Sequence, residues 1–424
     1  MDAFLVRGSG PLSGTVRING AKNSALKLMA AALLAPGTAT LHNVPAIADI
    51  AVMADVLRYL GVTVTAGDGT YRLEVPEEIG NEAPPHLVSK LRASIVVLGP
   101  LLARNERVRI AQPGGCDLGN RNIDMHLSGL QMMGARIRVA AEHIEASVDR
   151  LVGADIELPF ASVGATENLL MAAVTAKGTT RISNAAREPE ISDLANFLRA
   201  MGAHISGDGT PEIVVHGTQE LTPAEHVVVP DRIEAGTYAV AAAITGGELK
   251  IEEVVPAHLR LPIDKLRAAG VDVEVGERHL VVGSRGRLRA VDVVTLPYPG
   301  FPTDLQPQFL TMLSQAAGTS MLTENVFDGR FSFVEQLVRM GAEVYTEGHH
   351  AIVRGPRQLR GAVVRATDLR AGAALVLAGL VAEGETIVTE PRHVDRGYAD
   401  LAGTLRALGA DVVRGSVDVH AGAA

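Results

Sequence analysis

The sequence predicts an α/β protein built from six copies of one supersecondary unit. A helical stretch that ends in glycine and continues into a short strand occurs six times, with about 70 residues between successive glycines. A second helix, apolar on all sides and therefore typical of a buried helix, precedes it in each unit. Each unit then reads helix, strand, helix, strand, strand, with one further strand leading in. The six glycines are Gly61, Gly134, Gly202, Gly270, Gly341 and Gly409.

The helix before each glycine is predicted to be amphipathic. In the first unit Ile50, Met53, Ala54 and Leu57 recur at helical spacing. The glycine that follows, Gly61, suits the left-handed conformation that ends many helices. Short turns should then pair strands, as for 62–65 with 72–75 and 274–275 with 279–282. The buried helices are expected over 25–34, 94–103, 166–176, 235–244, 310–317 and 370–382.

A loop with Pro223 and Pro230 separates the first three units from the last three. We therefore expect two similar domains that divide near residue 230, with central helices wrapped by sheets. The strand over 4–6 could complete either domain. A linear solenoid of six units is the alternative architecture.

Composition excludes several classes of protein. The 424 residues carry a formal net charge of −9 and include one cysteine and no tryptophan. One cysteine cannot form an internal disulfide or a cysteine-rich metal site. The negative charge and scarce aromatics argue against a general nucleic-acid binder. The longest apolar runs are too short to span a bilayer, and the N-terminus lacks a signal-peptide pattern. We expect a soluble cytoplasmic protein with no metal.

Three segments carry candidate chemistry. The sequence Gly-Ala-Lys-Asn at 20–23 enters the first buried helix, where backbone N–H groups and Lys22 would attract an anion, although a surface lysine beside an ordinary helix start is the alternative. The glycine-rich stretch 113–121 holds the only cysteine, Cys116, which is either reactive or structural. Arg92 and Arg121 lie near it in a locally cationic stretch and are candidates for an anion site.

The second half offers further candidates at the turns of its units. Asp304 and Asp368 each precede a buried helix and could simply be N-caps. Arg187, Arg330 and Arg396 occupy turns that follow buried helices in three units, and such turns could line one cleft. His126, on a predicted helix, is interpreted as a polar group satisfied within the fold.

Nine motifs in order resemble one family. They are 20–23, 91–94, 113–116, 162–166, 184–190, 230–234, 301–304, 366–370 and 395–398. The chain is similar to the UDP-N-acetylglucosamine 1-carboxyvinyltransferase family of enolpyruvyl transferases from residue 1 to about 415. The resemblance implies a two-domain inside-out α/β barrel whose domains close over substrate, with residues 22–229 in one domain and 1–21 plus 230–424 in the other.

The resemblance also implies an activity. The family transfers the enolpyruvyl group of phosphoenolpyruvate to the 3′-hydroxyl of UDP-N-acetylglucosamine, releasing phosphate, in the first committed step of peptidoglycan synthesis. It implies two small-molecule partners, no cofactor and no obligate protein partner. Cys116 matches the proton donor and the target of the inhibitor fosfomycin, and Asp304 the general base. Positions matching the phosphoenolpyruvate ligands are Lys22, Asn23, Arg121, Arg370 and Arg396, of which Lys22 and Arg396 also count as catalytic.

Positions that match the family's UDP-sugar contacts are Asn23, Arg92, Arg121, Asn122, Ile123, Asp124, Met125, Phe160, Ala161, Ser162, Val163, Asp304 and Val326. Three residues depart from the family's pattern. Asn122 stands where proline is frequent, Phe160 where lysine is frequent, and Asp117 where a small neutral residue is common. A non-catalytic paralogue would require loss of Lys22, Asp304 or Arg396, all of which are present. An enolpyruvyl transferase for another acceptor stays open.

Overall fold

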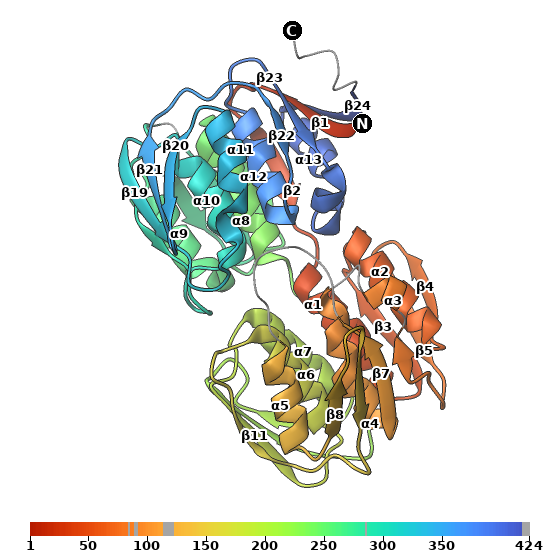
Figure 1. Ribbon diagram of the computed structural model, residues 1–424. Helices are drawn as coiled ribbons and strands as arrows, with labels where there is room; N and C mark the ends of the chain where they lie inside the picture. Colours follow the sequence, from red (N-terminus) through yellow and green to blue (C-terminus); the bar gives the residue numbers. More distant parts are fainter. Residues whose placement is uncertain (84, 89–91, 113–122, 285, 418–424) are drawn as a thin grey trace. The chain divides into compact units, whose positions relative to one another are not determined.

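The computed structural model describes residues 1–83, 85–88, 92–112, 123–284 and 286–417. They form two compact units, which are treated separately below (Figure 1). The C-terminal unit contains residues 1–19 together with the described chain from 230 onward, and the N-terminal unit contains the described residues between 20 and 229. Within the described residues, no helix combines the length and the apolar character needed to cross a membrane.

The N-terminal unit has seven α-helices within the described residues. They are α1 (Lys22–Ala31), α2 (Ala48–Tyr59), α3 (Pro85–Val88), α4 (Leu98–Arg104), α5 (Asp124–Met132), α6 (Val163–Ala173) and α7 (Pro189–Ala200), with 3-10 helices η1 (Ala32–Leu34) and η2 (Arg92–Val97). Its strands are β3 (Gly37–His42), β4 (Thr63–Gly67), β5 (Thr70–Val75), β6 (Glu82–Ala83), β7 (Arg107–Ala111), β8 (Arg136–Val139), β9 (His143–Ser147), β10 (Asp155–Glu157), β11 (Thr179–Ser183), β12 (His204–Ser206), β13 (Glu212–His216) and β14 (Glu225–Val227).

The C-terminal unit repeats this plan. Its helices are α8 (Arg232–Thr245), α9 (Arg260–Ala268), α10 (Gln306–Leu313), α11 (Val334–Arg339), α12 (Leu369–Gly379) and α13 (Leu401–Ala407), with η3 (Pro256–Leu259), η4 (Thr303–Leu305), η5 (Arg330–Phe333) and η6 (Pro391–Arg396). Its strands are β1 (Asp2–Arg7), β2 (Ser13–Arg17), β15 (Glu248–Glu252), β16 (Asp272–Val275), β17 (His279–Gly283), β18 (Val293–Val294), β19 (Gly318–Thr323), β20 (Glu343–Glu347), β21 (His350–Gly355), β22 (Val363–Arg365), β23 (Glu385–Thr389) and β24 (Asp411–Ser416).

Six four-stranded sheets share one topology. Each has a parallel pair at one edge followed by two antiparallel strands, as in β10-β11-β13-β12 and β18-β19-β21-β20. The other sheets are β14-β3-β5-β4, β6-β7-β9-β8, β2-β15-β17-β16 and β22-β23-β1-β24. The N-terminal strand β1 therefore completes the last sheet, between β23 and β24. The described sheets stay separate and do not merge into one closed barrel.

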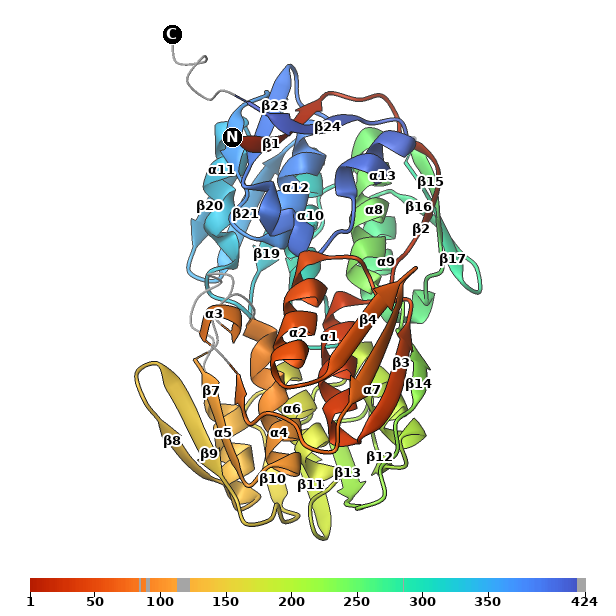
Figure 2. The same cartoon turned by 90° about the vertical axis from the view of Figure 1, so that its right-hand side faces the viewer.

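The apolar helices lie inside these sheets, as the sequence predicted. In the C-terminal unit α8, α10 and α12 pack against one another, with the sheets outside them (Figure 2). Every residue of α12 is buried, and so is every residue of α10. The α/β fold class with six repeats and buried helices is thus confirmed.

All six repeat glycines end their helices in the left-handed region. Their φ angles lie between 90° at Gly270 and 105° at Gly202, where a side chain would be strained. The residue after each glycine donates its N–H to a carbonyl five residues earlier, as Val62 does to Leu57 at 3.0 Å. This is the Schellman hydrogen bond that closes a helix end. The glycine-ended helix predicted from sequence is therefore confirmed.

Candidate active site

Lys22 begins α1 as a buried cation. It is 7% exposed, and its Nζ lies 2.6 Å from Oδ2 of the buried Asp49 in the first turn of α2. The chain approaches through Gly20, where a Cβ would lie 1.7 Å from the Asn43 carbonyl oxygen. Only glycine fits there, so the backbone is held at one distance from β3. The alternative of a surface lysine is wrong, and Lys22 is a fixed cation at a helix N-terminus.

Asn23, the next residue, is half-buried at the same helix end. Its carbonyl oxygen accepts a hydrogen bond from Lys27 Nζ at 2.7 Å. Lys27 also lies 3.5 Å from Glu167, a fully buried carboxylate of α6. Burial raises the pKa of Glu167 to about 7, although Lys27 opposes the shift. The buried ion pair between Lys27 and Glu167 therefore stabilises the first turn of α1.

The two predicted runs for the UDP-sugar lie at the start of α5 and of α6. Ser162 caps α6 through its hydroxyl, which accepts from the Ala165 N–H at 3.3 Å. His126 in α5 and Asn168 in α6 share a hydrogen bond of 3.1 Å, and Gly164 leaves room for the imidazole ring. The two helix starts are thereby held side by side. His126 is buried and hydrogen-bonded, which confirms its interpretation as a satisfied polar group.

The residues in these two runs are accessible to different degrees. Asp124 and Phe160 are exposed, whereas the others are intermediate, namely Ile123, Met125, Ala161, Ser162 and Val163. Phe160 keeps 38% of its surface accessible. The predicted nucleotide positions therefore form a partly open edge of the N-terminal unit.

Asp304 lies in η4 of the C-terminal unit between two buried arginines. Its Oδ1 accepts from Arg330 Nη2 at 2.5 Å. Its Oδ2 accepts from Arg370 Nε at 3.3 Å and Nη2 at 3.2 Å. Asp304 does not cap a helix, so that alternative is wrong. Its side chain is 25% exposed while both guanidinium groups are almost completely buried, so the carboxylate is the accessible member of the cluster.

Arg370 is the second residue of α12 and is held from several sides. Asp368 caps this helix by accepting the Arg370 and Ala371 N–H groups at 2.8 and 3.2 Å, as the sequence predicted. Burial would lower the pKa of Arg370, but its interactions with Tyr398, Asp304 and Asp231 outweigh burial and raise that pKa. Arg370 therefore stays a cation although it is 1% exposed.

Arg330 is the site residue whose role the sequence did not identify. It was singled out only as an arginine of a turn, yet it is fully buried and links Asp304 to Asp368, whose Oδ1 lies 3.7 Å from Nη1. The feature of the sequence that could have pointed to this role is the position of Arg330 directly after an Asn-Val-Phe-Asp-Gly turn, in the same unit as Asp304. Arg396 ends η6 and is partly exposed in the same unit. Arg187 belongs to the N-terminal unit, so the shared cleft of turn arginines stays a prediction.

Several predicted residues lie outside the described part of the chain. These are Cys116, Asp117, Arg121 and Asn122. For Arg92 the structure describes only the backbone, which begins η2. Their predicted roles therefore stay predictions.

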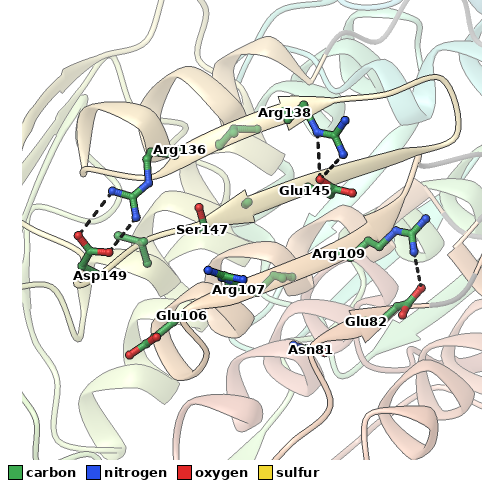
Figure 3. A pocket seen from close by; sticks show the side chains of 14 residues that line it. Asn81, Glu82, Glu106, Arg107, Arg109, Arg136, Arg138, Glu145, Ser147 and Asp149 are labelled. Atoms are coloured by element: carbon green, nitrogen blue, oxygen red, sulfur yellow. Dashed lines mark hydrogen bonds and ion pairs between the residues drawn. The ribbon is translucent and has the colours of Figure 1, made fainter.

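A shallow pocket of about 700 Å³ lies on the sheet β6-β7-β9-β8 and is lined by four arginines and four acidic residues (Figure 3). Its arginines pair with acids: Arg109 with Glu82, Arg136 with Asp149, and Arg138 with Glu145. These pairs are exposed, and paired surface charges leave little net attraction for an anion. Neither this pocket nor any other described part of the chain groups three His, Cys, Asp or Glu side chains that could hold a metal ion.

Known proteins match this chain along almost its whole length. The family model for EPSP synthase (3-phosphoshikimate 1-carboxyvinyltransferase) matches residues 6–405. A protein of Gluconobacter oxydans named UDP-N-acetylglucosamine 1-carboxyvinyltransferase is 54% identical over 98% of this chain and 99% of its own. One of Halalkalibacterium halodurans, named UDP-N-acetylglucosamine 1-carboxyvinyltransferase 1, is 51% identical over 98% and 94%.

Solved structures agree. The enolpyruvyl transferase NikO from Streptomyces tendae has a TM-score of 0.90 and 27% identity over 98% of this chain and 99% of its own. An EPSP synthase of Acinetobacter baumannii, with a TM-score of 0.75 at 19% identity over 98% of this chain and all of its own, shares the fold. The chain belongs to the EPSP synthase family and, within it, to the family of the UDP-N-acetylglucosamine 1-carboxyvinyltransferases, as its motifs predicted.

Proposed function

We propose that this protein transfers the enolpyruvyl group of phosphoenolpyruvate to the 3′-hydroxyl of UDP-N-acetylglucosamine and releases phosphate. The observation that carries the proposal is the identity of about half of all residues with relatives of that name, over nearly the full length of both chains. The reaction is the first committed step of peptidoglycan synthesis. We propose a cytoplasmic location, because both substrates are phosphorylated anions that do not cross membranes unaided.

Phosphoenolpyruvate carries a carboxylate and a phosphate and therefore needs several fixed cations. We assign Lys22, Arg370 and Arg396 to this role, with Arg121 and Asn23. Lys22 is supported by its pairing with Asp49 at a helix N-terminus, and Arg370 by its rigid place in α12. The planar guanidinium fork of an arginine matches the geometry of a carboxylate or a phosphate group.

The transfer needs an acid and a base. We assign Asp304 as the base that takes the proton of the sugar hydroxyl while its oxygen bonds to C2, and Cys116 as the donor that protonates C3. The product of this addition is a tetrahedral ketal. Loss of phosphate together with one proton from C3 then restores the double bond. Asp304 suits its role because it is the accessible carboxylate of its cluster.

The UDP-sugar would contact the starts of α5 and α6 together with Val326. We include Asn23, Arg92, Arg121, Asn122, residues 123–125 and 160–163, and Asp304 in this site. The support is the partial exposure of the described residues and the His126–Asn168 hydrogen bond that keeps both helix starts together. We further propose that residues 22–229 and 1–21 plus 230–424 act as two domains.

The deciding experiment measures phosphate release from phosphoenolpyruvate. The purified chain is assayed with UDP-N-acetylglucosamine, with shikimate 3-phosphate and without acceptor. We expect turnover only with the first. Turnover only with shikimate 3-phosphate, the acceptor named in the description of the matching family model, would overturn the assigned acceptor.

A further inference from the structure

Glu324 is a buried carboxylate to which the proposed chemistry gives no role. It directly follows β19 and is 1% exposed. Its Oε1 accepts from Thr295 Oγ1 at 2.9 Å and from the N–H groups of Val326 at 2.9 Å and Phe327 at 3.1 Å. Its Oε2 accepts from Thr303 Oγ1 at 3.0 Å. Four donors from three segments thus converge on one anion, which is the arrangement that stabilises a buried charge.

The repeat architecture does not require this carboxylate. In two other repeats the residue after the corresponding strand is a partly exposed glutamate, Glu253 or Glu390, that pairs with an arginine. In two more it is an asparagine, Asn43 or Asn184, with a left-handed φ of 57° or 53°. Each donates its side-chain amide to a carbonyl oxygen on the parallel side of the sheet, at 3.1 and 2.8 Å. Here Asn325 makes that bond instead, to the Thr295 carbonyl at 3.2 Å. Glu324 is therefore available for a different task.

The Thr303 hydroxyl connects Glu324 to the proposed base. The Thr303 hydroxyl donates its proton to Glu324, so its oxygen is free to accept a hydrogen bond on the other side. Arg330 Nε donates that bond to Thr303 Oγ1 at 3.2 Å. The same guanidinium donates through Nη2 to Asp304. The position of Asp304 thus depends on Arg330, and that of Arg330 on a hydroxyl oriented by Glu324.

A second connection runs through Phe327. Its N–H is held by Glu324, and the Arg330 guanidinium carbon lies 5.3 Å from the centre of its ring. A cation over an aromatic face at this distance is attracted to it. Glu324 therefore reaches Arg330 from two sides, and one of them is the segment that carries Val326.

We infer that Glu324 is a positioning residue that fixes the base Asp304 and the segment 325–327 as one rigid group. The inference rests on the proposed function, since it assumes that Asp304 takes the proton of the sugar hydroxyl and that Val326 contacts the nucleotide sugar. A base must lie within hydrogen-bond reach of that proton, so its placement governs the rate of the chemical step.

Thr303 provides the sharper test, because valine has nearly the same shape without the hydroxyl. We expect Thr303→Val to lower kcat about tenfold with the KM for UDP-N-acetylglucosamine within twofold of the wild-type value, since loss of one positioning hydrogen bond acts on the chemical step. Thr303→Ser, which keeps the hydroxyl, should restore most of kcat. The matched control is Thr323→Val, which removes a hydroxyl one residue from Glu324 that contacts only His350 among the described hydrogen bonds.

Glu324→Gln tests the second connection. The amide oxygen can still serve the Val326 and Phe327 N–H groups, but the amide nitrogen then faces Thr303 as a donor. We expect kcat to fall about tenfold, as in Thr303→Val, and the KM for UDP-N-acetylglucosamine to rise severalfold, because the hydrogen bonds to 326–327 lose their charge assistance. The double variant with Thr303→Val should have the kcat of either single variant.

Hydrogen exchange provides a readout that needs no activity. The peptide over 325–330 should exchange about tenfold faster in Glu324→Gln than in wild type or Thr323→Val. If the wild type releases no phosphate, the proposed function fails, while exchange still decides whether Glu324 holds this segment. If the wild type is active, wild-type kcat in Thr303→Val, equal losses in Thr303→Ser and Thr303→Val, or unchanged exchange in Glu324→Gln would each overturn the inference.

Discussion

Replacing Asp304 by asparagine should destabilise the protein as well as abolish turnover. The carboxylate lies between two buried guanidinium groups, at 2.5 Å from Arg330 and 3.2 Å from Arg370. Asparagine offers one acceptor oxygen, so one arginine would keep a partner and the other would face an NH₂ group. The variant therefore leaves a buried cation opposite a donor, with Asp368 near Arg330 and Asp231 near Arg370 as the remaining anions.

The size of the effect follows from these contacts. A hydrogen bond to a charged group contributes about 1.5–3 kcal/mol, and breaking a fully buried pair costs about 3–5 kcal/mol. Because a quarter of the Asp304 side chain is exposed, the lower range applies, and we expect a loss of about 2–3 kcal/mol. For a unit of about 200 residues this corresponds to a melting temperature lower by roughly 4–12 °C.

Calorimetry of the full chain with and without inorganic phosphate measures this loss. Phosphate should raise the melting temperature of Asp304→Asn more than that of wild type, because an anion can occupy the place of the lost carboxylate. The matched control is Asp328→Asn, which removes an exposed carboxylate 3.9 Å from His349 and should leave the melting temperature unchanged. A wild-type melting temperature in Asp304→Asn, or equal phosphate effects in both proteins, would refute the reasoning.

Three further changes test other parts of the site. Lys27→Met should cost about 3–5 kcal/mol of unfolding free energy at pH 8 by leaving Glu167 without its cation. The loss should shrink near pH 5.5, because burial raises the pKa of Glu167 from 4.5 to about 7 and the protonated form needs no cation; a pH-independent loss in denaturant titrations would contradict this. Asp49→Asn should lower kcat/KM for phosphoenolpyruvate about tenfold, because it removes the carboxylate that holds Lys22 Nζ at 2.6 Å. An unchanged kcat/KM in steady-state kinetics would contradict this. Fosfomycin should alkylate Cys116, and an unmodified intact mass, under conditions in which a known family member reacts, would count against that role.

Much of the fold could be predicted because local rules and the repeat point to the same structure. Each glycine-ended helix combines a helical apolar stripe with a residue that tolerates positive φ, and both signals recur about every 70 residues. The strand pairs 62–65 with 72–75 and 274–275 with 279–282 also correspond to β4–β5 and β16–β17. What the residues themselves left open was the place of the strand over 4–6, because its partners β23 and β24 lie almost 400 residues away in the chain.

Candidate site residues could be predicted where the residue type and its place in a local motif together indicate a chemical role. By local rules Lys22 at a helix start was a candidate for an anion site, beside the alternative of a surface lysine. The sequence could not reveal its partner Asp49, since that contact depends on how α1 packs against α2. Asp304 and Asp368 looked alike as acids before buried helices. The structure separates them: Asp368 caps α12, whereas Asp304 turns towards two arginines.

The contrast between those two aspartates explains why the roles of Arg330 and Glu324 could not be predicted from the sequence. A cap is a contact within three residues, so a motif can predict it. The group around Asp304 joins segments that the parallel pairing of β18 with β19 brings together, since that register places Thr295 beside Glu324 and Asn325. Thr295 lies about 30 positions before Glu324 and Asn325 in the sequence, and no periodic pattern connects them. Their coupling depends on register, and a one-residue slip of β18 would turn Thr295 away from Glu324. The proposed base is therefore located by a tertiary contact of one repeat, while two other repeats use an asparagine at the same position to bridge the parallel strands.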